Sequence, residues 1–207
     1  MNKNYALTDQ QKNVWNSEMF YSGTNINNIG GYLLINEKVN FELLEKAANI
    51  YIRNNEVTRY HFNLENNEPL QTLIEYLPFK LKLISVDSMD ALKELTTELV
   101  SKPFEIINSD LYSFTLFSLP DGRGGVIPIF HHLIADAWSL SLFISEFVDI
   151  YSNLLEGMND FQVYPSYSEY IVSSEEYEKS NRFLKDKDFW NSTFDKSPEL
   201  TYISNKK

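Results

Sequence analysis

The middle of the chain reads Val126-Ile127-Pro128-Ile129-Phe130-His131-His132-Leu133-Ile134-Ala135-Asp136-Ala137-Trp138-Ser139. Its first five residues are apolar on both faces of an extended chain, which predicts a strand in the centre of a sheet. Pro128 cannot donate to a strand ladder, so we expect it at a bulge or at a position without a hydrogen bond. Asp136 is the expected N-cap of a long helix that ends at Gly157. The segment therefore predicts a buried strand that turns into a helix, with two histidines at the turn.

The flanking sequence predicts further helices and strands. Thr8 and Gln11 form a capping-box pattern that begins a helix, with Val14, Trp15 and Met19 as its buried stripe. Two more helices are expected over residues 40–54 and 88–101, and the polar region 164–194 predicts one or two surface helices. Short apolar runs predict strands over 32–35, 58–64, 70–76, 81–84, 111–119 and 125–130.

Composition and charge exclude several classes of protein. The chain has 207 residues, no cysteine, and a formal charge of −11 from 18 basic and 29 acidic residues. This charge repels nucleic acids and anionic membranes, and no run of Lys or Arg offsets it. The lack of cysteine excludes disulfides, Cys-ligated metals and thiol nucleophiles, and no apolar stretch approaches the roughly 20 residues that span a bilayer. We therefore expect a cytoplasmic globular protein with no nucleic-acid or membrane partner.

The chain contains three histidines, His61, His131 and His132. Adjacent residues in an extended chain point to opposite sides, so only one of the central pair can face a given cavity. Both imidazoles could be hydrogen-bonded core groups, or they could bind a metal, or one could act as a general acid or base with Asp136 nearby. A metal site is disfavoured, because no cysteine and no HExxH spacing are present. No serine elbow, P-loop or dinucleotide fingerprint occurs, which leaves direct attack by a substrate nucleophile.

Five segments resemble the motifs of one family, in the same order along the chain. Residues 130–139 resemble the HHxxxDG signature of condensation domains of nonribosomal peptide synthetases, which are chloramphenicol-acetyltransferase-like acyltransferases. Residues 7–15 are similar to the family's first motif, and residues 56–62 to its second motif, of the form RHExLRTxF. Residues 102–106 are similar to its PFDL segment, and residues 188–190 to the stretch that leaves the first lobe. This resemblance implies an α+β fold, a two-layer sandwich with a mixed β-sheet and helices packed on one face.

The resemblance also implies roles for the residues of the signature. His132 would be the catalytic imidazole, which accepts a proton from the acceptor amine, or orients it, during attack on a donor thioester. His131 would pack inward, and Asp136 would form a structural ion pair with Arg59. Trp138 is expected in the core together with the apolar face of the helix that follows.

The donor side of the site departs from the family pattern. Ala137 replaces the glycine of the signature and adds a methyl group where the donor arm passes, and Ser139 would lie beside the same channel. The lobe would bind no metal and no cofactor of its own, because both substrates arrive on the phosphopantetheine arms of carrier proteins. The form of the first motif, close to Met1, resembles starter domains that take a fatty acyl donor, and peptidyl donors stay open.

The length of the chain suggests one lobe of two. Condensation domains contain two such lobes, so we expect residues 1–195 to be the N-terminal lobe and 196–207 to begin the connection to a C-terminal lobe. A lone lobe, as a fragment or the product of a split gene, should be inactive or nearly so, and its exposed apolar surface should favour self-association. The alternative is a non-catalytic, condensation-like platform that binds carrier or partner proteins.

Overall fold

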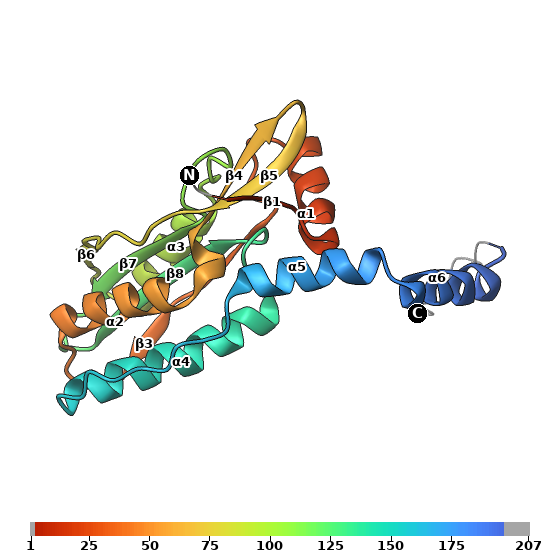
Figure 1. Ribbon diagram of the computed structural model, residues 1–207. Helices are drawn as coiled ribbons and strands as arrows, with labels where there is room; N and C mark the ends of the chain where they lie inside the picture. The colour runs from red at the N-terminus through yellow and green to blue at the C-terminus, as the bar shows by residue number, and fades with distance from the viewer. Residues whose placement is uncertain (1–2, 197–207) are drawn as a thin grey trace. The chain divides into compact units, whose positions relative to one another are not determined.

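The computed structural model describes residues 3–196, which belong to two compact units, Met1–Tyr167 and Ser168–Lys207. The second unit contains α6 (Asn181–Thr193) and all but the first residue of α5 (Tyr167–Glu178) (Figure 1). Apart from residue 196, the predicted connection over 196–207 lies outside the described residues. No helix in the described part is both long and apolar enough to cross a membrane. The signature segment lies in the first unit.

The first unit contains two sheets. One has three antiparallel strands in the order β1-β5-β4, and the other has the order β2-β8-β7-β6 with β3 also paired to β8. β6 runs parallel to β7 and the remaining pairs are antiparallel, so the predicted mixed sheet is confirmed. The strands are β1 (Asn4–Ala6), β2 (Asn28–Gly30), β3 (Leu33–Ile35), β4 (Tyr60–Glu65), β5 (Glu68–Leu73), β6 (Lys82–Ser85), β7 (Tyr112–Ser118) and β8 (Gly124–His131).

β8 is the central strand, and all eight of its residues are buried, as its apolar sequence predicts. β2 and β3 pair with opposite ends of the same edge of β8. The Pro128 carbonyl accepts from the Gly31 N–H at 3.3 Å, so the nitrogen of Pro128 faces the break between β2 and β3. Pro128 therefore occupies a position where the ladder needs no donor. A Cβ atom at Gly30 would lie 2.5 Å from the Pro128 oxygen, and glycine lets the two strands approach there.

Helices cover both faces of the five-stranded sheet (Figure 1). α2 (Phe41–Asn54) and α4 (Ala137–Leu155) contact each other on one face, where Phe143 meets Phe130 with ring centroids 5.4 Å apart. On the other face, Leu92 of α3 (Met89–Val100) joins a core that contains Phe117, Ile127 and Ile129. The predicted α+β class is confirmed, whereas the prediction that helices pack on one face is wrong, because α3 covers the second face of β8, which is buried on both sides.

α1 (Asp9–Phe20) begins with the predicted capping box, in which Thr8 and Gln11 exchange backbone and side-chain hydrogen bonds of 3.0 and 3.3 Å. Of its predicted buried stripe, Trp15 is confirmed as buried, but Val14 is only partly buried and Met19 is 45% exposed, and the other buried residues are Gln11 and Glu18. The helix turns two polar side chains inward, and both find partners near the two histidines.

Candidate active site

The two central histidines lie where β8 ends and the chain turns toward α4. His131, the last residue of β8, is 1% exposed, whereas His132 is only partly buried. Three backbone bonds fix the turn: the His131 N–H donates to Leu111 O at 2.9 Å, the His132 N–H to Asn27 O at 2.8 Å, and the Ile134 N–H to His131 O at 3.0 Å. The end of a buried strand thus presents one imidazole inward and leaves the other accessible.

His131 is held as a neutral imidazole. Its Nδ1 accepts a hydrogen bond of 3.2 Å from the Leu133 N–H, so the ring proton sits on Nε2. Nε2 then donates to Oε2 of Glu18 at 3.2 Å. Burial lowers the pKa of His131, and the nearby Glu18 carboxylate offsets only part of this effect. With both ring nitrogens engaged inside the protein, His131 cannot act on a substrate.

His132 has the opposite arrangement of its ring nitrogens. Nδ1 lies 3.0 Å from the Ala135 carbonyl oxygen, which can only accept, so Nδ1 carries the proton in the neutral ring. No residue of the described chain hydrogen-bonds Nε2 of His132, whose lone pair is therefore available to a ligand. A neutral imidazole in this tautomer can accept a proton or a hydrogen bond from an amine.

The predicted ion pair between Asp136 and Arg59 is not formed in the structure. Asp136 instead caps α4, and its Oδ1 accepts from the Ser139 N–H at 2.8 Å and from the Ser139 hydroxyl at 2.7 Å. These two bonds hold the pKa of Asp136 below its usual range. Arg59 donates from Nη1 to the Ile74 carbonyl at 2.8 Å, and its buried Nε has no partner among the described residues. The carboxylate caps the start of the helix, as its position before α4 predicts, and it forms no ion pair with Arg59.

Asp136→Ala should therefore reduce the free energy of unfolding by about 1 kcal/mol, the usual cost of losing an N-cap, measured by urea denaturation. Asp136→Asn keeps a capping oxygen and should change stability by less. Removing one partner of a buried ion pair costs about 3–5 kcal/mol. A loss of that size in both variants would contradict the capping role.

The rest of the signature lies in the first turn of α4. Ala137 is exposed and is not among the residues with positive φ, so alanine at the glycine position introduces no backbone strain. Ser139 is partly buried and engages Asp136. The prediction that Trp138 lies in the core is wrong, because its side chain is 73% exposed. Trp138 lies nine residues before buried Phe147, and at 3.6 residues per turn this spacing places the two on opposite sides of the helix.

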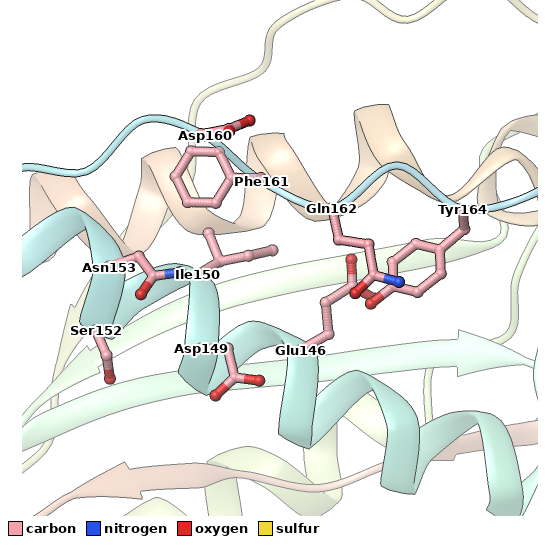
Figure 2. Close-up of a pocket in the computed structure, with 9 residues that line it drawn as sticks. All are labelled: Glu146, Asp149, Ile150, Ser152, Asn153, Asp160, Phe161, Gln162 and Tyr164. Atoms are coloured by element: carbon pink, nitrogen blue, oxygen red, sulfur yellow. The ribbon is translucent and has the colours of Figure 1, made fainter.

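A separate polar cavity of about 250 Å³ lies between α4 and residues 160–164 (Figure 2). Glu146, Gln162 and Tyr164 gather at one end of it in Figure 2. Burial raises the pKa of Glu146 to about 7, against the lowering effect of the Asn55 amide, which lies 3.0 and 3.1 Å from the two carboxylate oxygens. The negative charge of Asp149 adds to the increase. The cavity contains none of the signature residues.

The raised pKa of Glu146 makes stability depend on pH. The folded state binds the Glu146 proton more tightly than the unfolded state, so this stabilisation is complete below pH 4.5 and is lost as pH rises through about 7. Glu146→Gln should therefore exceed the parent chain in free energy of unfolding by about 1–2 kcal/mol at pH 8 and by less at pH 5, after discounting for solvent screening. Urea denaturation at both pH values measures this, with exposed Glu94→Gln as the control. An equal effect of Glu146→Gln at both pH values would contradict the prediction.

Comparisons with known proteins agree with this fold and signature. The family model for the condensation domain matches residues 1–207. Surfactin synthase subunit 1 of Bacillus subtilis (strain 168) is 32% identical over 96% of this chain and 6% of its own length. Bacitracin synthase 1 of Bacillus licheniformis is 25% identical over 90% of this chain and 4% of its own length.

Solved structures show the same fold. The starter condensation domain of rhizomide synthetase RzmA has a TM-score of 0.86 at 19% identity over 95% of this chain and 49% of that chain. The first condensation domain of the CDA synthetase has a TM-score of 0.83 at 19% identity over 98% and 53%. The chain thus spans about half of these solved domains and a small part of the curated relatives. Because the condensation-domain family model matches the whole length of the chain, the chain belongs to the condensation-domain family.

Proposed function

We propose that the chain is the catalytic-motif half of a condensation domain of a nonribosomal peptide synthetase. The reaction is amide formation between an acyl or peptidyl thioester on one carrier protein and the amine of an aminoacyl group on another. The observation that carries this proposal is the state of His132, whose Nδ1 proton is engaged by Ala135 O while Nε2 is left without a partner in the described chain. Family membership supports the reaction class.

The proposed reaction needs one proton acceptor at the attacking amine. The amine nitrogen attacks the thioester carbonyl carbon, a C–N bond forms, and His132 Nε2 takes or holds the amine proton. The C–S bond then breaks, and the thiolate that leaves with the donor carrier takes up a proton. Asp136 does not orient this imidazole as in a triad, because Nδ1 bonds to a backbone carbonyl and the carboxylate caps α4.

The donor is the narrower part of the proposal. We propose a fatty acyl donor, supported by the starter-like form of the first motif at residues 7–10. Ala137 and Ser139 would border the donor arm. Exposed Ala137 adds its methyl group without backbone strain, so it narrows this path without changing the local fold. Rates with fatty acyl and peptidyl thioesters of the same carrier protein would distinguish the two donors.

The remaining wall of the site would come from the second half of the fold, the part of the solved domains that this chain does not match. α4 exposes five large apolar side chains with exposed fractions between 44% and 73%: Trp138, Leu142, Ile144, Val148 and Leu155. Isolated apolar side chains on a surface are common, but five on one helix are suited to contact another part of a domain. We propose that this second half is a partner of the chain, together with the carrier proteins, and that the lobe itself binds no cofactor or metal.

Amide formation from carrier-bound donor and acceptor, followed by mass spectrometry, tests the proposal. The chain joined to a second half should form product, and the chain alone should form none. A joined domain that binds carrier proteins but forms no amide would support the non-catalytic platform instead.

A further inference from the structure

Glu18 is a buried carboxylate in the last turn of α1, and its side chain is only 4% exposed. Glutamate is rarely buried to this extent without partners, because its charge loses the solvation of water. Oε2 of Glu18 accepts from the Asn27 amide at 2.7 Å and from His131 Nε2 at 3.2 Å. The carboxylate is therefore placed to hold two other residues in fixed positions.

Both partners of Glu18 are joined directly to His132. Asn27 uses its backbone carbonyl to accept from the His132 N–H at 2.8 Å. His131 precedes His132 in the chain, and its other ring nitrogen accepts from the backbone N–H of Leu133, which follows. One carboxylate oxygen thus holds Asn27, which pairs with the His132 backbone just before β2, and His131, which is in turn bonded to Leu133.

A second side chain of α1 holds the far side of the same turn. Nε2 of buried Gln11 donates to the Leu133 carbonyl at 3.2 Å. Gln11 is itself paired with Gln71 of β5 by two amide hydrogen bonds of 2.7 and 3.0 Å. Gln11 and Glu18 lie seven residues apart, which places them on one face of the helix. α1 therefore clamps the turn at two points without touching the imidazole of His132.

We propose that Glu18 is a positioning residue for His132, which acts through Asn27 and His131 to hold the His132 imidazole in its Nδ1–H tautomer with Nε2 outward. The effect of Glu18 on the reaction rate rests on the proposed function, whereas its effect on the tautomer of His132 does not. Because His131 is neutral, the contact is a hydrogen bond from Nε2–H to an oxygen and needs no full negative charge. A glutamine oxygen at the same place can accept the same two bonds.

Imidazole ¹⁵N spectra of the 207-residue chain test the inference without an activity assay. The chain has three histidines, and His61→Gln and His132→Gln variants assign their signals. We expect one tautomer for His132 in the parent chain and in Glu18→Gln, and an averaged mixture of tautomers in Glu18→Ala. Glu94→Gln, at an exposed position on α3, is the matched control and should change nothing. A single Nδ1–H tautomer in folded Glu18→Ala would overturn the inference.

Asn27→Ala decides the case if Glu18→Ala does not fold. This substitution removes the bond between Glu18 and the Asn27 amide and leaves the bond between Glu18 and His131. We therefore expect partial averaging of the His132 tautomers. An unchanged spectrum would overturn the inference. In a domain completed by its second half, Glu18→Ala should lower kcat by about 10- to 100-fold with little change in KM, while Glu18→Gln retains most of the rate. If His132→Ala leaves the rate unchanged, the proposed function fails, and the spectra still decide whether Glu18 positions the ring.

Discussion

His132→Ala is expected to lower kcat/KM for amide formation by about 10²- to 10⁴-fold in a domain completed by its second half, the contribution usual for a positioned general acid or base. The variant removes the nitrogen that would accept the amine proton. It should fold normally, because the side chain is only partly buried and contributes one side-chain hydrogen bond, to Ala135 O. A net hydrogen bond is worth about 1 kcal/mol. Product formation by mass spectrometry and unfolding in urea measure the two effects separately.

His61→Ala is the control for His132→Ala. His61 lies on β4, and its Nε2 is 2.9 Å from Oδ1 of Asp110, whose side chain is 60% exposed. Losing a solvent-screened pair of this kind costs little, so the rate should stay within about twofold of the parent domain. Equal rates for His132→Ala and the parent domain would reject the catalytic role and favour the platform interpretation.

The turn that carries His132 could be predicted because its determinants are local. A strand that is apolar on both faces must be central, and an Asp before an amphipathic segment marks the start of a helix. β8 and α4 accordingly begin and end within two residues of their predicted bounds. Alternation along the strand also assigns one histidine to each side. The three-residue strands β1 and β2 were not predicted, because they contain polar Asn4 and Asn28 and form no apolar run, whereas the equally short β3 is apolar throughout.

The residues that position the turn were missed because their partners are distant in sequence. Glu18 and His131 are 113 residues apart, and Gln11 and Gln71 are 60 apart. A pattern that assigns Glu and Gln to the surface places both outside the core. The sequence contains a weak signal for this face of α1. Gln11, Trp15 and Glu18 recur at helical spacing, just as the apolar residues Val14, Trp15 and Met19 do. The expected ion pair between Asp136 and Arg59 is absent for the opposite reason, because Asp136 has a local partner. Its carboxylate caps the first turn of α4, three residues along the chain.

The core that supports α4 should be highly sensitive to one substitution. Phe143→Ala is expected to reduce the free energy of unfolding by about 3–5 kcal/mol, a large part of the 5–15 kcal/mol typical of a domain. Phe143 is 1% exposed, and its ring centroid lies 4.9 Å from that of Tyr51 in α2 and 5.4 Å from that of Phe130 in β8. The substitution leaves a cavity where the two helices meet the sheet.

Phe20→Ala is the matched control, because it deletes the same side chain from a position that is 80% exposed. Its effect should stay within about 0.5 kcal/mol, as is usual for surface substitutions. Urea denaturation followed by circular dichroism measures both variants. Similar losses for the two variants would show that Phe143 is not part of a packed core. Because α4 starts five residues after His132, the loss of Phe143 should also broaden the His132 imidazole signals in the folded variant, whereas the loss of Phe20 should not.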